Sequence, residues 1–287
     1  MNDHTRTPAI RSERTVRLLQ TAVLFILMVA LFGWLGIRAF GGNLFVIFSV
    51  MLVVSLLISS GASPRRVLGR GVFPVNRREA PEIYSILSEL ASRAGLQNVP
   101  HLYYTPSGVP NAVTVGAGEN TAIVVTQGLL NRLTRRELAG VLAHEVAHIA
   151  NNDVRLLTLA ESVRLATTLL SKVGQFVLLF TFPLFLFAGE PLPLGFLALT
   201  IFAPVVSLLL HLALMRAREF EADLTAVRLT GDPSALAAAL QRLSAAGRSF
   251  LELLFPVPMR NEFSLFRSHP ATAERVRRLM ALQRSPG

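Results

Sequence analysis

Long apolar stretches constrain the fold of this chain more than any other feature. Residues 18–37 form one such stretch, with Gln20 and Thr21 as polar members near its start and Arg38 at its end. Because a helix rises 1.5 Å per residue, a stretch of this length crosses a hydrocarbon core of about 30 Å. A second stretch, residues 43–62, follows after a connection too short to hold a domain. The two stretches predict a transmembrane hairpin.

A cleaved signal peptide is the alternative for the first stretch. The arginines before it resemble the charged region of a signal: Arg6, Arg11, Arg14 and Arg17. The apolar stretch is longer than that of a signal peptide, however, and it ends without a small-x-small cleavage site. We therefore expect an uncleaved membrane anchor.

Two further apolar stretches lie in the second half of the chain. Residues 192–214 are the clearer candidate for a membrane span. Residues 173–188 are short, contain Pro183 and begin beside Lys172 and Gln175, so a re-entrant or interfacial segment is the alternative there. The chain is thus expected to be a mainly α integral membrane protein with about four transmembrane helices.

The basic residues indicate the orientation in the membrane. The formal net charge is +10, from 28 basic and 18 acidic residues. Arginines concentrate before the first stretch, after the second and after the fourth, whereas the two hairpin tips hold only Arg38 between them. The positive-inside rule therefore places both termini and the polar sequence in the cytoplasm. In a soluble protein this charge would suggest nucleic acid, but beside anionic lipid headgroups no nucleic-acid partner is expected.

The polar sequence is divided into two pieces that are together the size of one domain. We expect a cytoplasmic tail over residues 1–17 and a transmembrane hairpin over 18–62. The cytoplasmic domain takes residues 63–164 and 216–287, and the second transmembrane hairpin, 165–215, lies between these pieces. Apolar periodicity predicts an α+β domain with a small β-sheet. Its expected strands are 101–105, 112–115 and 122–126, and its expected helices are 79–94, 235–246, 271–283 and one that begins with a Thr134/Glu137 capping box.

The capped helix contains the sequence His144-Glu145-Val146-Ala147-His148. Histidines at i and i+4 lie on one face of a helix, so both imidazoles can bind one metal ion. Glu145 can reach the remaining side of that metal, where a water would bind. The alternative is a buried helix whose histidines make core hydrogen bonds. Burying three such polar groups on an otherwise apolar helix is costly without compensation, and a metal ion provides it.

The third metal ligand must be oxygen or nitrogen, because the chain has no cysteine. This absence also excludes disulfides and cysteine nucleophiles. Glu219 and Asp223 stand at i and i+4 just after the fourth apolar stretch. One carboxylate can bind the metal while the other accepts a hydrogen bond from a ligand histidine. A solvated helix face is an equal alternative for this segment taken alone.

These motifs together resemble the HtpX-type membrane zinc metalloproteases, which are relatives of the prenyl-protein (CAAX) endopeptidases. The resemblance rests on the His144–His148 motif and the Glu219/Asp223 pair, separated by membrane segments. Three other stretches match: Pro110-Asn111-Ala112, His148 through Asp153, and Ser268-His269-Pro270 with Glu274-Arg275. It covers essentially the whole chain. One departure is Asn152, because the family often has glycine at that position.

The resemblance implies a zincin-like (gluzincin) protease domain and a role for each matching residue. His144, His148 and Glu219 would bind one Zn²⁺, Glu145 would be the general base, and Asp223 would orient a ligand histidine. His269 would donate to the oxyanion, and Arg275 would be a supporting charge close to the substrate. Asn111 would hold the substrate backbone, with residues 112–115 adding the peptide as a strand.

The expected function is a membrane endopeptidase that cleaves damaged or misassembled membrane proteins. We expect it in a bacterial or archaeal plasma membrane, with its active site on the cytoplasmic side as the arginine distribution indicates. A specific processing protease of the CAAX kind is the alternative enzyme. A zinc-containing membrane chaperone is less consistent with Glu145, and a transporter would need charged or broken helices at the bilayer midplane.

Overall fold

The computed structural model describes residues 15–38, 71–116, 118–189, 191, 193–246 and 272–284. The predicted membrane stretch 43–62 and His269 lie outside these residues. The chain divides into two compact units. The first comprises Met1–Ser59 and Leu156–Ala217, and the second comprises Ser60–Arg155 and Arg218–Gly287.

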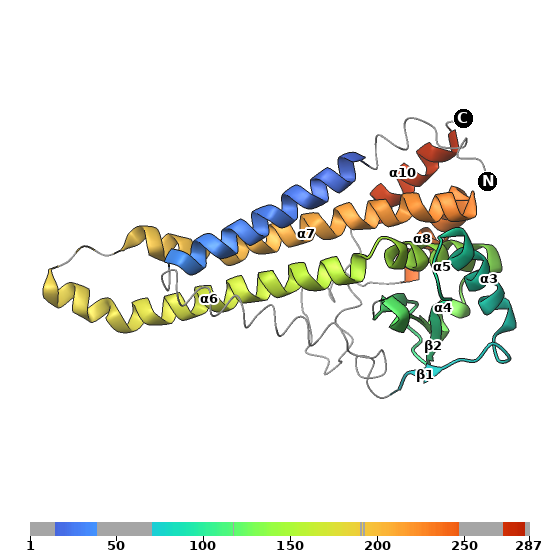
Figure 1. Ribbon diagram of the computed structural model, residues 1–287, viewed down its shortest axis with the longest axis horizontal. Coiled ribbons are helices and arrows are strands. Elements are labelled where there is room, and N and C mark those ends of the chain that lie inside the picture. Colours follow the sequence, from blue (N-terminus) through green and yellow to red (C-terminus); the bar gives the residue numbers. More distant parts are fainter. Residues whose placement is uncertain are drawn as a thin grey trace. The chain divides into compact units, whose positions relative to one another are not determined.

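Three long helices carry the described part of the first unit (Figure 1). They are Thr15–Arg38, α6 (Asp153–Ala188) and α7 (Leu194–Thr230), and each is long and apolar enough to cross a membrane. Residues 173–188 are helical throughout, with Pro183 inside α6. Three of the about four predicted spans are therefore candidate membrane helices, and the remaining one, residues 43–62, lies outside the described residues.

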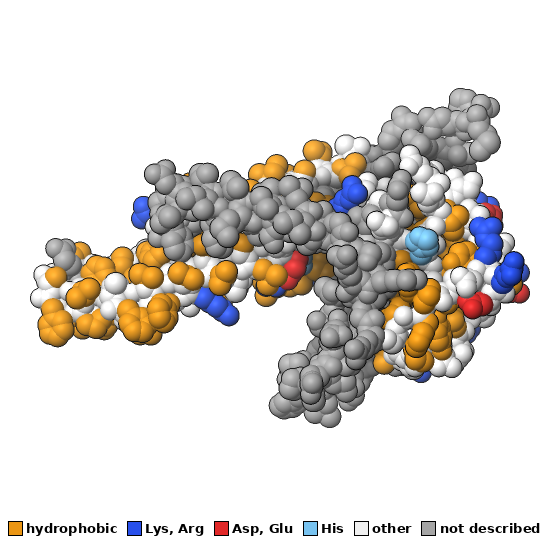
Figure 2. Space-filling view, turned by 60° about the horizontal axis from the view of Figure 1, so that its bottom comes forward, with side chains coloured by type: hydrophobic (Ala, Val, Ile, Leu, Met, Phe, Trp, Pro, Cys, Tyr) orange, Lys and Arg blue, Asp and Glu red, His pale blue; other side chains and the backbone are white. Residues whose placement is uncertain are grey.

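The helices of the first unit pack through a common apolar cluster and a few polar contacts. The cluster combines Met28, Phe32 and Leu35 with residues of α6 and α7. The Gln175 side chain donates to the main-chain oxygen of Thr200 at 2.8 Å. Many large apolar side chains on these helices are exposed, and Figure 2 shows them along the helical surface. Water-soluble surfaces rarely carry such large apolar patches, whereas lipid-facing surfaces do.

A four-stranded sheet forms one layer of the second unit. Its strands are β1 (Phe73–Pro74), β2 (His101–Thr105), β3 (Ala112–Val115) and β4 (Ala122–Thr126), in the order β1-β2-β4-β3. β2 pairs with β4 in parallel, and the other two pairs are antiparallel. Every residue of β4 is buried, as expected of a central apolar strand. β3 is an edge of the described sheet.

In the described part of the second unit, five helices accompany the sheet. They are α3 (Pro81–Arg93), α4 (Gln127–Leu130), α5 (Arg135–Ala150), α8 (Pro233–Ala246) and α10 (Thr272–Arg284). The predicted capping box begins α5, with the Thr134 side chain accepting from the Glu137 amide and the Glu137 carboxylate accepting from the Thr134 amide. α5 contacts α3, β3 and α8 and is buried along most of its length. Gly140 allows the approach of α8, since a Cβ there would lie 3.0 Å from the Leu236 amide nitrogen.

Candidate metal centre

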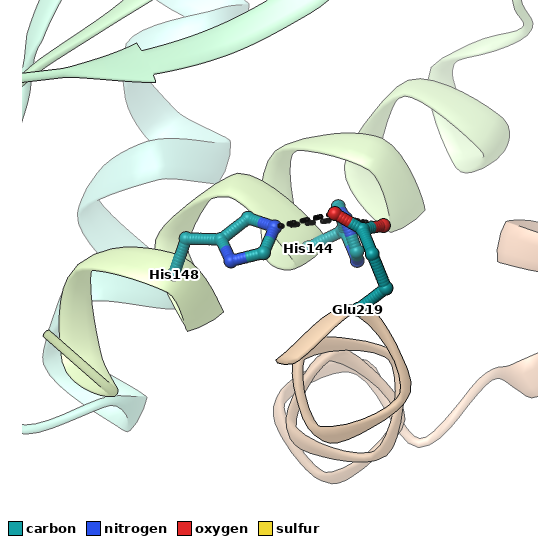
Figure 3. Close-up of side chains that lie close together, drawn as sticks. All are labelled: His144, His148 and Glu219. Carbon is teal, nitrogen blue, oxygen red and sulfur yellow. Dashed lines mark hydrogen bonds and ion pairs between the residues drawn. The ribbon is translucent and has the colours of Figure 1, made fainter. Parts of the chain in front are cut away.

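The two histidines of α5 and the first carboxylate of the α7 pair converge in the second unit. The Nε2 atoms of His144 and His148 are 3.2 Å apart. One oxygen of Glu219 lies 3.5 Å from His144 Nε2, and the other lies 3.6 Å from His148 Nε2. All three side chains are buried, and their ligand atoms lie within 4.8 Å of one another. Figure 3 shows Glu219 facing both imidazoles from the neighbouring helix.

This spacing fits a metal ion. Zinc bonds of about 2.05 Å at tetrahedral angles separate neighbouring ligand atoms by roughly 3.3 Å. The two Nε2 atoms match this separation at 3.2 Å, and one Glu219 oxygen approaches each of them. Two imidazole nitrogens and one carboxylate oxygen are also a ligand set that leaves a coordination position open for catalysis. The three residues can therefore hold a catalytic metal ion.

His148 is oriented by a carboxylate that follows it closely in the chain. Its Nδ1 lies 2.7 Å from an Asp153 oxygen, and Arg218 Nε donates to the other Asp153 oxygen at 2.5 Å. α5 ends at Ala150, and the chain turns through Asn152, whose φ is 57°. Glycine and asparagine adopt this left-handed conformation with the least strain, so asparagine suits this position. The turn brings Asp153 back to His148.

His144 is oriented by residues from two other helices. Its Nδ1 lies 3.1 Å from an oxygen of Asp223 on α7. Arg275 on α10 donates to both Asp223 oxygens at 2.7 and 2.8 Å and to Glu219 at 2.8 Å. The Arg275 side chain is only 2% exposed. Each ligand histidine therefore has a carboxylate on its Nδ1 side, and each carboxylate is paired with a buried arginine.

The surroundings raise the pKa of both histidines. Burial alone would lower the pKa of His148, but hydrogen bonds to Asp153 and Glu219 outweigh it and raise the pKa to about 10. Burial and the charge of Arg275 would lower the pKa of His144, but Asp223 and Glu219 raise it above its usual value. Without a metal both imidazoles thus hold a proton to a higher pH than free histidine does, and a metal ion has to displace these protons to bind.

Glu145 is buried beside the histidines, where an edge strand contacts it. The hydroxyl of Thr114 on β3 lies 2.8 Å from a carboxylate oxygen of Glu145 and 3.1 Å from its main-chain oxygen. Glu145 is 4% exposed, so this contact is made in a largely dry environment. Glu145, which the sequence predicts as the general base, therefore projects from α5 and is held in place by a contact with β3.

The other predicted site residues are placed differently. Asn111 directly precedes β3. Its main-chain amide donates to the Thr126 hydroxyl at 2.8 Å, and its main-chain carbonyl accepts from the Thr126 amide at 3.0 Å. These bonds fix its backbone, and its contact with substrate stays a prediction. Arg275, predicted near the substrate, lies among the carboxylates of the centre. The oxyanion role of His269 also stays a prediction.

Three residues of the centre were missed by the sequence argument. Asp153 stood inside a matching motif, but no role was assigned to it, although it follows His148 by five residues. Arg218 directly precedes Glu219, and from the sequence alone the arginines of this segment indicate only the orientation in the membrane. Thr114 belongs to no recognisable sequence motif. A search for carboxylates just beyond the end of the histidine helix could have found Asp153, since ligand histidines usually have such partners.

Known proteins support a family assignment. Residues 77–283 match the model of peptidase family M48. A protease HtpX homolog of Acaryochloris marina is 40% identical over 73% of this chain and 74% of its own length. Another, of Syntrophobacter fumaroxidans, is 33% identical over 92% of this chain and 98% of its own. The crystal structure of Ste24p from S. mikatae is 20% identical, with a TM-score of 0.48 over 95% of this chain and 66% of that chain.

The family model covers well over half of the chain, and both HtpX homologs exceed 30% identity. The expected resemblance to HtpX-type proteases is thereby confirmed. A protease acts on protein substrates, and three apolar helices of this length imply a surrounding lipid bilayer. The chain belongs to peptidase family M48 and is an integral membrane metalloprotease.

Proposed function

We propose that the metal is zinc, one ion per chain, and that the protein is an endopeptidase with Glu145 as its general base. The observation that carries the proposal is the convergence of buried ligand atoms from His144, His148 and Glu219, which lie within 4.8 Å of one another. When bound, zinc polarises the scissile carbonyl and acidifies the attacking water. Glu145 then accepts a proton from that water and delivers it to the leaving amine.

Neighbouring residues support these steps. Asp153 and Asp223 keep the Nδ1 proton on each ligand histidine, so that Nε2 is free to bind the metal. β3, an edge of the described sheet, adds the substrate as an extended strand, and Asn111 at its start holds the substrate backbone. His269 donates a hydrogen bond to the developing oxyanion.

The proposed cellular role is quality control of membrane proteins. The site faces the cytoplasm of a bacterium or archaeon, as the arginine distribution favours. The membrane hairpins 18–62 and 165–215 hold the protease domain, residues 63–164 and 216–287, at the bilayer. Misfolded membrane proteins are then the substrates, and no nucleic-acid partner is required.

The test of the chemistry is Glu145→Gln, which preserves the shape of the side chain and removes its basic oxygen. We expect full zinc content and a loss of cleavage of roughly 10²- to 10⁴-fold, the contribution of a positioned base. Glu89→Gln on α3 is the matched control, because Glu89 is exposed. Cleavage of β-casein by Glu145→Gln at the wild-type rate would contradict the mechanism.

The test of the cellular role is a comparison of membrane proteomes from cells with wild-type protein and with Glu145→Gln. Many proteins accumulating in the Glu145→Gln cells would support quality control. Accumulation of one precursor would instead indicate a specific processing protease.

A further inference from the structure

We propose that Thr114 is a positioning residue: its hydroxyl orients the Glu145 carboxylate, while its main chain lies at the edge where the substrate strand docks. The inference rests on the proposed function, because it takes Glu145 as the general base. It adds a direct connection between substrate docking and the position of that base.

The side chain of Thr114 stands where an apolar residue is expected. Side chains alternate along a strand, so Ala112 and Thr114 share one face of β3 and Val113 and Val115 share the other. Ala112 belongs to the main apolar core, which includes residues of α5. Val113 and Val115 pack on the opposite side of the sheet, with Tyr103 among others. A hydroxyl on the core face needs a partner, and here that partner is Glu145.

The Thr114 hydroxyl is a specific ligand of Glu145. In the described part of the chain it is the one group that donates a hydrogen bond to the Glu145 carboxylate, at 2.8 Å. It contacts a single oxygen of that carboxylate, so the second oxygen remains available for a proton. The same hydroxyl lies 3.1 Å from the Glu145 main-chain oxygen, which fixes it against α5. A hydrogen bond to one carboxylate oxygen restricts rotation of the side chain and so defines where the other oxygen lies.

The main chain of Thr114 points the other way, to the edge of the described sheet. The Thr126 amide donates to the Asn111 carbonyl, so these opposite residues form a hydrogen-bonded pair of the β3–β4 ladder. Hydrogen-bonded and non-hydrogen-bonded pairs alternate in an antiparallel ladder. The pair of Thr114 and Ile123 is then non-hydrogen-bonded, and the amide and carbonyl of Thr114 are directed away from β4. A substrate strand added at this edge meets these groups.

Thr114 thus contacts both the substrate strand and the general base, Glu145. A peptide strand bound to the amide and carbonyl of Thr114 fixes that residue, and its hydroxyl fixes Glu145. The substrate is thereby registered against the base through a single residue of β3. A general base has to lie within hydrogen-bonding reach of its proton, so loss of this contact reduces turnover more than binding.

The test uses the full-length, zinc-loaded protein in detergent and the casein-derived peptide that wild type cleaves fastest. Thr114→Val removes the hydroxyl but keeps the branched shape and the strand propensity. We expect kcat to fall roughly 10- to 100-fold, a part of the contribution of a positioned base, with KM within about twofold. Thr114→Ser keeps the hydroxyl, and we expect it to stay within about threefold of wild-type kcat.

Two controls separate positioning from packing. Thr105→Val makes the same change on β2, at a hydroxyl without a hydrogen bond to another described residue, and should leave kcat unchanged. Zinc affinity, measured by chelator competition, should stay within about threefold in all variants, because the ligand atoms are intact. If Thr114→Val lowers the melting temperature, Thr114→Ala, which introduces no new bulk, must reproduce the loss of kcat.

A double-mutant cycle measures the interaction between Thr114 and Glu145 in a second way. Glu145→Asp shortens the base and withdraws it from the Thr114 hydroxyl, so Thr114→Val should cost much less in that background than in wild type. Equal losses in both backgrounds would overturn the inference. So would equal losses in Thr114→Val and Thr114→Ser, or a higher KM at constant kcat. If Glu145→Gln is inactive while Thr114→Val matches wild type, the positioning role alone fails. Full activity of Glu145→Gln would refute the proposed base itself.

Discussion

The two halves of the metal centre use the same chemistry but are assembled differently. Around His148 the orienting carboxylate, Asp153, comes from five residues further along the chain. Around His144 the carboxylate comes from α7, and its arginine lies 131 positions away from the histidine. Both histidines nevertheless acquire a carboxylate on Nδ1 that is paired with a buried arginine. The centre therefore has a half formed by a local turn and a half formed by tertiary packing, with Glu219 between them.

The largest effect should come from the residue that both halves share. Glu219→Gln removes the anionic ligand, and we expect zinc affinity to fall on the order of 10³-fold. Apparent zinc-binding energies of about 10–16 kcal/mol are divided among three or four ligands, so each contributes several kcal/mol. Chelator competition measures the change, with Glu274→Gln on α10 as a control outside the ligand set. Stoichiometric zinc held at wild-type affinity would exclude Glu219 as a ligand.

The next change compares the two halves directly. Asp153→Asn and Asp223→Asn each remove one orienting charge, and we expect each to reduce zinc affinity by roughly 10- to 100-fold. Both also leave a buried arginine without its full counter-charge, which should lower the free energy of unfolding by up to about 3–5 kcal/mol. Asp153→Asn removes the carboxylate paired with Arg218, whereas in Asp223→Asn the guanidinium of Arg275 keeps its contact with Glu219. Unfolding of the zinc-free proteins in urea should therefore show Asp153→Asn as the less stable variant. Equal free energies of unfolding would mean that Arg218 and Arg275 depend equally on the carboxylates that these substitutions remove.

The protonation of the histidines gives a smaller effect with a definite sign. Because both pKa values are raised, the zinc-free protein holds protons on these imidazoles to a higher pH than free histidine does, and zinc binding should release protons. Zinc affinity should then rise with pH. The stabilisation that His148 gives to the zinc-free protein has the opposite sign: it is present below pH 6.5 and is lost as the pH rises through about 10. Calorimetry in buffers of different ionisation enthalpy counts the released protons. Asp153→Asn and Asp223→Asn should each reduce that number, and an unchanged number would show that these carboxylates do not set the pKa values.

The smallest effect concerns the turn that builds the local half. Asn152 has a φ of 57°, so Asn152→Gly should leave stability nearly unchanged. Asn152→Val places a β-branched residue in the left-handed region and should cost about 1–2 kcal/mol. Thermal unfolding of the zinc-free protein measures both changes. If valine were tolerated as well as glycine, the turn would not be what holds Asp153 against His148.

Part of the centre followed from spacing along single helices. His144, Glu145 and His148 lie on one turn of α5, and Glu219 and Asp223 lie on one turn of α7, so their relative positions depend only on helix geometry. The pairing between these helices could not be obtained in the same way. That Asp223 lies at His144, and Asp153 at His148, depends on how α5, α7 and the turn at Asn152 are arranged.

The sequence by itself determined three membrane helices, strands β2, β3 and β4, helices α3, α5, α8 and α10, and the metal-binding motif. These features depend on hydrophobicity and on the repeat of a helix or strand, which are properties of neighbouring residues. Only the tertiary structure decided that Arg275 pairs with Asp223 and Glu219, and that the Thr114 hydroxyl contacts Glu145. Such contacts join residues far apart in the chain, and they arise from the packing of whole elements, which no local pattern encodes.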